Sequence, residues 1–252
     1  MAAVRVTVLG CSGTHPAPDR LCSSYLVEAH GYRLLLDCGN GSLTNLQRVC
    51  DVAELDAVIV SHLHPDHFAD LYGLYYALRF HRDGPRSVPV YAPAGAPAHI
   101  AQLLPPDSFD TFVDCCRFRA VSAGDVLELG PLRVTLFAAH HPVETLASRV
   151  ESGGTVFSYS ADSAATPAIV DCARDADLFA ADCTWLDREG PYPPGTHMTG
   201  LQAGAQAEEA GARRLLVTHV LPAYDPVEVA AEAARSYGGQ VLVARDRLEL
   251  GL

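Results

Sequence analysis

Short apolar runs separated by turn-forming residues recur along the whole chain. Runs rich in Val, Ile, Leu and aromatic side chains between Gly, Pro and Asp are typical of strands. They predict strands at residues 4–9, 25–29, 33–37, 57–60, 88–91, 126–129, 132–138, 148–151, 155–160, 178–181, 215–218 and 240–244. Apolar residues at helical spacing predict helices at residues 42–49, 67–80, 96–104, 167–173, 201–210 and 226–237.

Several of the predicted strands follow one another closely enough to form hairpins, for example around His30-Gly31 and Gly153-Gly154. Hairpins indicate mixed rather than parallel sheets, and the helices between the strands need a sheet face to cover. Two mixed β-sheets packed together with helices outside satisfy this pattern, so we expect an α/β sandwich with αββα layers. A chain of 252 residues fits one domain, 1–252.

The charge balance restricts the partners of the chain. There are 18 basic and 30 acidic residues, a formal charge of −12, which weighs against a long polyanionic substrate such as a nucleic acid. No apolar stretch approaches the length of a membrane span, and the first ten residues lack the features of a signal peptide. We therefore expect a cytoplasmic protein that acts on a small molecule.

Eight cysteines are present, but none forms a C-x-x-C pair, so a zinc ribbon is not expected. In a reducing compartment they are expected to be thiols that pack as small buried apolar residues.

The strongest chemical signal follows the predicted strand at 57–60 directly. It is the segment Ser61-His62-Leu63-His64-Pro65-Asp66-His67, with three imidazoles and a carboxylate. In an extended chain His62 and His64 lie on one side, and a turn at Pro65 lets Asp66 and His67 face a second point. Imidazole nitrogen and carboxylate oxygen are ligands that zinc takes, so one segment can serve two metals.

This segment resembles the H-x-H-x-D-H motif of the metallo-β-lactamase superfamily. The resemblance implies the αββα fold and two zinc ions, with manganese or iron tolerated by a similar ligand set. Asp162, in Tyr159-Ser160-Ala161-Asp162-Ser163, would bridge the metals. A histidine after the strand at 132–138 would complete the first site; His140 and His141 are both candidates, and the resemblance favours His141. The implied ligands are His62, His64 and His141 for the first metal and Asp66, His67 and His219 for the second.

Other segments resemble the RNase Z-like branch of that superfamily. They include Asp37-Cys38-Gly39-Asn40-Gly41 and His197-Met198-Thr199-Gly200. In that branch a histidine and an acidic residue assist the leaving oxygen. By position these are His197 and Asp182, although Asp stands where Glu is common. With Asp66 they form the implied catalytic set.

RNase Z enzymes hold tRNA with an arm inserted between the positions of His141 and Asp162. Here only a hairpin fits in that interval, and the chain is acidic. The chain is similar to RNase Z-like proteins without the arm, which include cyclic nucleotide phosphodiesterases. The predicted activity is hydrolysis of a small phosphodiester by attack of a metal-bound hydroxide. Aromatic residues of the helix at 67–80 could line its pocket, but their helical spacing favours the core.

Three alternatives remain open at this point. They are tRNA 3′-end processing, hydrolysis of a thioester or lactone by the same ligand set, and a non-catalytic zinc-binding protein. The segment Leu146-Ala147 departs from the Tyr-Gly common in the branch, and this change could reshape the pocket. A homodimer would suit the branch, but no residue pattern requires one.

Overall fold

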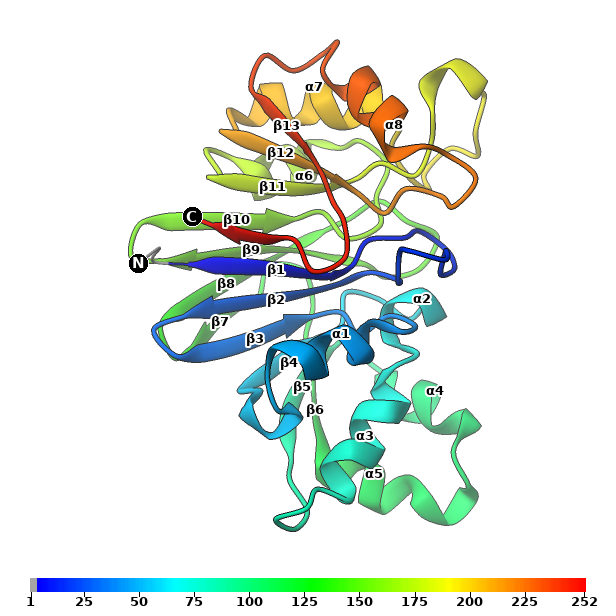
Figure 1. The fold of residues 1–252 in the computed structure, drawn as a ribbon, viewed down its shortest axis with the longest axis vertical. Coiled ribbons are helices and arrows are strands. Elements are labelled where there is room, and N and C mark those ends of the chain that lie inside the picture. The colour runs from blue at the N-terminus through cyan, green and yellow to red at the C-terminus, as the bar shows by residue number, and fades with distance from the viewer. Residues whose placement is uncertain (1–3) are drawn as a thin grey trace.

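The computed structural model describes residues 4–252 and contains two seven-stranded sheets. The first has the strand order β14-β1-β2-β3-β4-β5-β6 and the second β13-β12-β11-β10-β9-β8-β7. Figure 1 shows the sheets packed against each other in the middle of the molecule, with helices at both ends. The four layers are those of the predicted αββα sandwich, so the predicted fold class is confirmed.

The first sheet is built mainly from the N-terminal half of the chain. Its strands are β1 (Arg5–Gly10), β2 (Ser24–Ala29), β3 (Tyr32–Leu36), β4 (Ala57–Ile59), β5 (Val88–Ala92), β6 (Cys116–Ala120) and β14 (Glu249–Gly251). The helices beside it are α1 (Ser42–Val49), α2 (Pro65–Phe68), α3 (Leu71–Arg79), α4 (Ala96–Ile100) and α5 (Phe109–Cys115). Strands β3 to β6 run parallel, so their carboxyl ends lie at one edge of the sheet.

The second sheet follows in the C-terminal half. Its strands are β7 (Val126–Leu129), β8 (Leu132–Ala138), β9 (Leu146–Ser152), β10 (Thr155–Tyr159), β11 (Leu178–Asp182), β12 (Arg214–Thr218) and β13 (Gln240–Val243). Its helices are α6 (Pro167–Ala173), α7 (Gly200–Ala210) and α8 (Pro226–Ala233). Strands β10 to β13 are parallel, whereas β7 to β10 form antiparallel hairpins. Short 3₁₀ turns add η1 (Val52–Glu54), η2 (Ala101–Leu103), η3 (Pro106–Ser108) and η4 (Asp187–Glu189).

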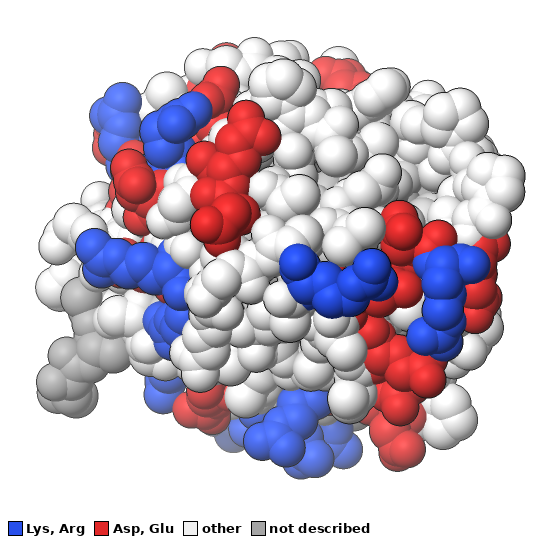
Figure 2. Space-filling view, turned by 90° about the horizontal axis from the view of Figure 1, so that it is seen from above, with Lys and Arg blue, Asp and Glu red and all other residues white. Residues whose placement is uncertain are grey.

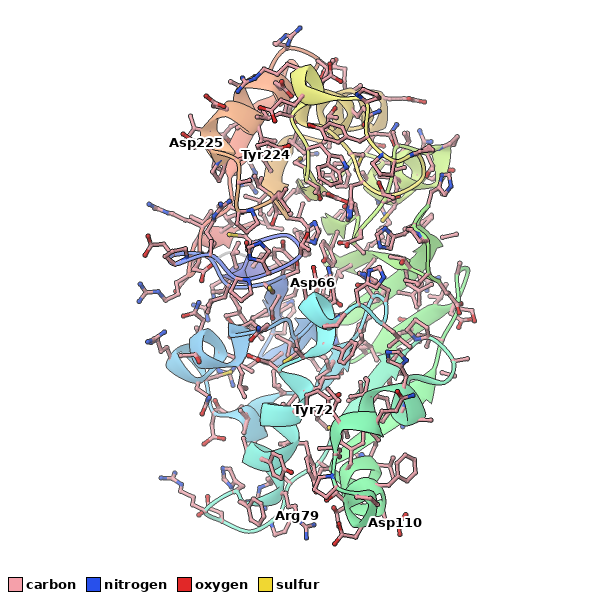
Figure 3. The ribbon with its side chains drawn as sticks, turned by 90° about the vertical axis from the view of Figure 1, so that its right-hand side faces the viewer. Asp66, Tyr72, Arg79, Asp110, Tyr224 and Asp225 are labelled. Atoms are coloured by element: carbon pink, nitrogen blue, oxygen red, sulfur yellow. The ribbon has the colours of Figure 1, made fainter. Side chains whose placement is uncertain are left out.

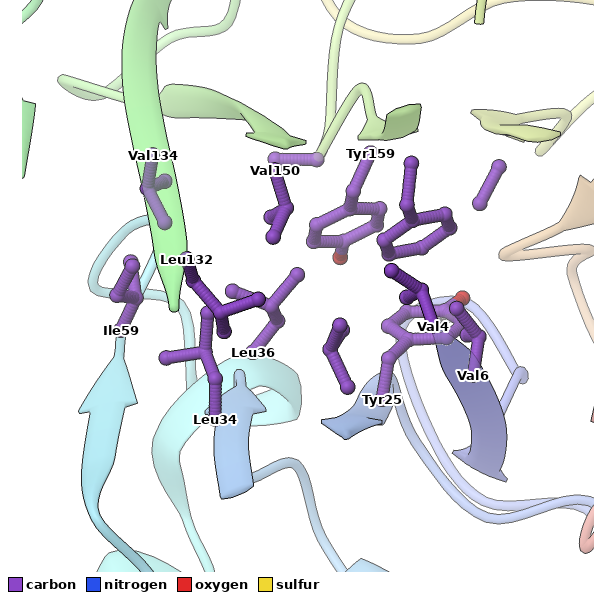
Figure 4. Close-up of a cluster of buried hydrophobic side chains, with 14 of the residues drawn as sticks. Val4, Val6, Tyr25, Leu34, Leu36, Ile59, Leu132, Val134, Val150 and Tyr159 are labelled. Carbon is purple, nitrogen blue, oxygen red and sulfur yellow. The ribbon is translucent and has the colours of Figure 1, made fainter. Parts of the chain in front are cut away.

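Three apolar cores hold the layers together. The central core lies between the sheets, and Figure 4 shows part of it, including Val6, Leu36, Leu132 and Val150. The second packs α1 to α5 on the first sheet, and the third packs α6 to α8 on the second. All eight cysteines are buried free thiols, as the sequence predicts.

Several predicted element boundaries are wrong. The predicted helix at 67–80 is two helices, because the backbone of Cys38 pairs on both sides of the break: its N–H donates to His67 O, and its carbonyl accepts from Asp70 N. The predicted helix at 226–237 ends at Ala233. Strand β6, strand β14 and helix α5 were not predicted. Among residues 4–252, no helix is long and apolar enough to cross a membrane.

Candidate metal centre

The predicted ligands come from segments that leave the sheets at one edge. His62 follows β4, Asp162 follows β10, and His219 follows β12. Parallel pairing puts the carboxyl ends of neighbouring strands at one edge of each sheet, and the short distances among these side chains show that the two edges lie together. Figure 3 looks onto that edge and places Asp66 near its centre, between the two halves of the molecule.

The first cluster contains His62, His64, His141 and Asp162, whose ligand atoms lie within 4.8 Å of one another. Nδ1 of His64 is 3.2 Å from Nε2 of His62 and 3.1 Å from Nε2 of His141. Oδ2 of Asp162 lies 3.6 Å from Nε2 of His62. These are the four residues that the resemblance assigns to the first metal.

The second cluster contains Asp66, His67, Asp162 and His219. Oδ1 of Asp162 is 3.0 Å from Nε2 of His67 and 3.2 Å from Nε2 of His219. Nε2 of His219 is also 3.3 Å from Oδ2 of Asp66. Asp162 therefore turns one carboxylate oxygen toward each cluster, which is the arrangement of a bridging ligand.

Four of the clustered histidines donate a hydrogen bond through Nδ1 to a protein acceptor outside the cluster. The acceptors are Ser61 Oγ for His62 (3.0 Å), Asp37 Oδ2 for His67 (2.8 Å), Thr196 O for His141 (2.8 Å) and Thr184 Oγ for His219 (2.9 Å). These bonds fix the tautomers and leave each Nε2 with a lone pair that faces the cluster.

The inward-facing atoms fit a cation. Lone pairs on nitrogens 3.1–3.3 Å apart repel one another unless a positive charge lies between them. Oδ1 of Asp162 is buried without a hydrogen-bond partner, a cost that a metal ion would remove. Imidazole and carboxylate donors in this number suit a divalent transition metal.

The protonation states favour the same conclusion. Burial lowers the pKa of His62 well below its usual range, so its imidazole is neutral. Burial would raise the pKa of Asp162, but His219, His67 and His62 outweigh it and hold that pKa well below its usual range. Around His67, burial is outweighed by the carboxylates of Asp162, Asp37 and Asp66, which raise its pKa. The carboxylates around His67 therefore favour positive charge in the second cluster, which a bound cation would supply in place of a proton.

Asp37 supports both clusters from beneath. Its carboxylate accepts hydrogen bonds from Ser61 N (2.7 Å), Ser61 Oγ (2.9 Å), His67 Nδ1 (2.8 Å) and Tyr159 Oη (2.9 Å). Ser61 in turn accepts from His62, so one buried carboxylate orients a histidine of each cluster. The sequence indicated the Asp37 segment through resemblance but gave no role for the side chain.

His197 and Asp182 lie beside the clusters and contact each other. Nδ1 of His197 is 2.8 Å from Oδ2 of Asp182 and 3.9 Å from Oδ2 of Asp162. The shorter Asp side chain therefore reaches the histidine. Burial opposes protonation of His197, but the Asp182 carboxylate outweighs it, and the pKa of His197 is raised.

Asp182 belongs to a third group of possible metal ligands, together with Asp162, His197 and His219. Its oxygens already accept hydrogen bonds from Ser163 N, Thr184 N, Thr184 Oγ and His197 Nδ1. With its acceptors occupied, Asp182 acts as an anchor for neighbouring side chains rather than as a ligand.

The other residues that the sequence offered for the site lie outside the ligand clusters. The backbone of His140 pairs with Ala164, and its side chain lies outside the three ligand groups. Tyr75 is 1% exposed and packs on Phe112, so this aromatic residue of α3 belongs to the core, as its helical spacing favours. Figure 3 shows Tyr72 and Arg79 progressively farther from Asp66.

Two contacts at the site have no signal in the sequence. Thr184 Oγ donates to Asp182 Oδ1 (2.6 Å) and accepts from His219. The N–H of Thr14 donates to Asp66 Oδ2 (2.8 Å), which orients that carboxylate. Close packing of the supporting loops is visible at Gly39, where a Cβ atom would lie 2.1 Å from the carbonyl oxygen of Asp66.

Comparison with known proteins identifies the family. A family model described as Beta-lactamase superfamily domain matches residues 32–220. The probable metallo-hydrolase YhfI of Bacillus subtilis is 34% identical over 247 residues, which cover 96% of this chain and 97% of YhfI. The crystal structure of YhfI matches with a TM-score of 0.87 and 30% identity, covering 98% of this chain and 99% of YhfI.

More distant similarities agree with this assignment. Ribonuclease Z of Haloarcula marismortui is 28% identical over 300 residues, covering 98% of this chain and 96% of the ribonuclease. The crystal structure of the short form of human tRNase Z has a TM-score of 0.76 at 20% identity, covering 98% of both chains, and so shares the fold. The match over residues 32–220 and the identity to YhfI show that this chain belongs to the β-lactamase superfamily and has the metallo-β-lactamase fold.

Proposed function

We propose that this chain is a hydrolase with two divalent metal ions that cleaves a small phosphodiester. The observation that carries the proposal is the pair of ligand clusters that share the buried carboxylate of Asp162. His62, His64 and His141 would hold one metal, and Asp66, His67 and His219 the other. Zinc suits these donors best, and manganese or iron suits a similar set.

Two divalent ions in these clusters would supply a water of lowered pKa and stabilise charge on the phosphoryl oxygens. The protein itself positions the metal ligands and supplies the proton donor. Asp162 holds the two clusters at a fixed separation, and the Thr14 N–H orients Asp66. His197, held through Nδ1 by Asp182, can give a proton from its ring to the leaving oxygen.

The proton donor favours a phosphodiester over a thioester. An alcohol leaves as a strongly basic alkoxide unless it is protonated, whereas a thiol, with a pKa of about 8.5, leaves readily as the anion. Burial opposes protonation of His197, but the Asp182 carboxylate outweighs it and raises its pKa, which favours the protonated form that can donate. A thioester hydrolase would not need the pair of His197 and Asp182 to protonate its leaving group.

The region between His141 and Asp162 favours a small substrate over tRNA. It consists mainly of the hairpin β9–β10, which turns at Gly153-Gly154. The ribonuclease Z similarity extends over 300 aligned positions, more than the 252 residues of this chain, so that relative carries insertions that are absent here. On the face seen in Figure 2, arginines lie next to acidic side chains and a broad area carries neither, and the formal charge of the chain is −12.

The proposal is tested by assaying the metal-loaded protein with bis(p-nitrophenyl) phosphate, 3′,5′-cyclic AMP, a thioester and precursor tRNA. The expected result is turnover of the phosphodiesters, which His64→Gln abolishes. His81→Gln is the matched control, because His81 lies far from the ligand clusters and pairs with Asp51. Turnover of the thioester alone, or specific cleavage of precursor tRNA alone, would contradict the proposed substrate class.

A further inference from the structure

A hollow of about 610 Å³ adjoins the metal centre, within the range of pockets that bind small organic ligands. The segment between β11 and α7 and the first turn of α7 supply most of its lining. His197 forms part of its wall. The His197 ring also lies beside Asp162 and 5.5 Å from the Trp185 ring, so this one side chain borders both the ligand clusters and the hollow.

One wall of the hollow is preformed. The rings of Trp185 and Tyr192 stack with centroids 4.6 Å apart and an interplanar angle of 9°. The Tyr192 hydroxyl donates to Leu186 O (2.7 Å), and Thr196 O accepts from His141 of the first cluster. A loop fixed at several points loses little conformational freedom when a ligand binds. Its aromatic and proline side chains present a flat apolar surface.

The polar end of the hollow offers one donor and one acceptor. Oε1 of Gln202 accepts from Thr199 N (3.0 Å), which leaves the amide NH₂ group of Gln202 free to donate. Oγ of Thr199 lies 3.4 Å from Oδ1 of Asp187, so Thr199 contacts both side chains. The Asp187 carboxylate has further acceptor capacity, and both side chains line the hollow.

The charge of the lining excludes one class of ligand. Asp187 is the one acidic residue among the lining residues, and none of them is Arg or Lys. A second phosphate would meet the Asp187 carboxylate and no Arg or Lys at the polar end. A neutral planar group that carries both an acceptor and a donor matches the flat wall and the polar end.

We propose that this hollow binds the nucleobase of a nucleotide substrate and selects a base with an exocyclic amino group. The Gln202 amide donates to a ring nitrogen, and the Asp187 carboxylate accepts from the amino group. The base lies along the wall formed by Trp185 and Tyr192. This inference rests on the proposed phosphodiesterase function and deepens it, because it names the substrate class and two residues that determine specificity.

The chain offers a probe of this hollow that does not depend on turnover. Trp185 is its single tryptophan, so intrinsic tryptophan fluorescence reports on this wall alone. The metal-loaded protein is titrated with adenosine 5′-monophosphate, with inosine 5′-monophosphate, in which oxygen replaces the amino group, and with inorganic phosphate. The expected result is a fluorescence change with a Kd at least about tenfold lower for the adenosine nucleotide, and no change with phosphate.

Two variants test the assigned contacts. Gln202→Glu keeps the acceptor that caps α7 but loses the donor, and Asp187→Asn loses the carboxylate. Each is expected to reduce the preference for adenosine over inosine to about onefold to threefold. Ala205→Glu is the matched control, since it adds one negative charge to an exposed position of the same helix and should leave the preference intact.

Equal Kd values for the two nucleotides, or an unchanged preference in both variants, would overturn the inference. Turnover of bis(p-nitrophenyl) phosphate, which carries no base, is measured on the same samples. Loss of base selectivity with intact turnover refutes the base-binding role alone. Base selectivity without turnover of any diester refutes the proposed hydrolysis and supports the binding site.

Discussion

Replacing Thr184 by Val is expected to weaken one of the two proposed metal sites. The Thr184 hydroxyl has a single proton, which it donates to Asp182 Oδ1, so it accepts the proton of His219 Nδ1. Valine has nearly the same shape but cannot accept. His219 is 2% exposed, so water cannot easily replace the lost acceptor. Leaving a buried N–H unsatisfied costs about 1–3 kcal/mol.

This cost should appear as a loss of metal affinity. Outer partners of metal-binding histidines contribute about 10–100-fold to affinity, which agrees with the cost of one unsatisfied donor. The site that contains His219 should weaken by that factor, while the site that contains His62, His64 and His141 should keep its affinity. The measurement is a zinc titration of the metal-free protein against a chromogenic chelator.

Thr184→Ser is the matched control, because it keeps the hydroxyl and should bind both metals almost as the wild type does. Two unchanged affinities in Thr184→Val would refute the role of this hydrogen bond. So would an equal loss in the Ser and Val variants, because the effect would then follow from packing.

Three further variants test other parts of the site. Asp162→Ala removes the shared carboxylate and should lower phosphodiester turnover by more than the roughly 100-fold that an outer partner contributes, measured as kcat/KM at saturating zinc. Asp37→Ala removes the acceptor of four buried hydrogen bonds and should lower the free energy of unfolding by about 3–5 kcal/mol in urea, with a smaller loss for Asp37→Asn. His197→Gln should lower the rate of cyclic AMP hydrolysis, in which an alkoxide leaves, by about 10²–10⁴-fold. Because Asp182 raises the pKa of His197 against the effect of burial, wild-type activity should fall as pH rises through that raised pKa, and the variant should lack this alkaline limb.

The layered fold and most strands could be predicted from the sequence because buried strands leave short apolar runs. The elements that were missed carry a weaker pattern. Strand β6 alternates Phe118 with the exposed Arg117 and Arg119, and β14 has only three residues. The break between α2 and α3 depends on backbone pairing with Cys38, which lies far away in the sequence. Periodicity reports only on neighbours along the helix.

The residues of the site also differ in how far the sequence alone predicts them. His62, His64, Asp66 and His67 could be predicted because one short segment carries them all. The distant residues, among them Asp162, could be assigned only through resemblance, and the structure brings them to the same place. Residues that hold the histidines in position, such as Thr184, leave no pattern in the sequence, because a buried hydroxyl becomes informative only when its distant partner, here His219, is known.

The central claim is that two metals held around Asp162 make this chain a phosphodiesterase. The most direct test is the rate of bis(p-nitrophenyl) phosphate hydrolysis by the metal-free protein as zinc is added in known equivalents. The account predicts that activity rises until two equivalents are bound, and that Asp162→Ala stays inactive throughout. A protein that binds two equivalents and hydrolyses no phosphodiester, or one that reaches full activity without added metal, would contradict it.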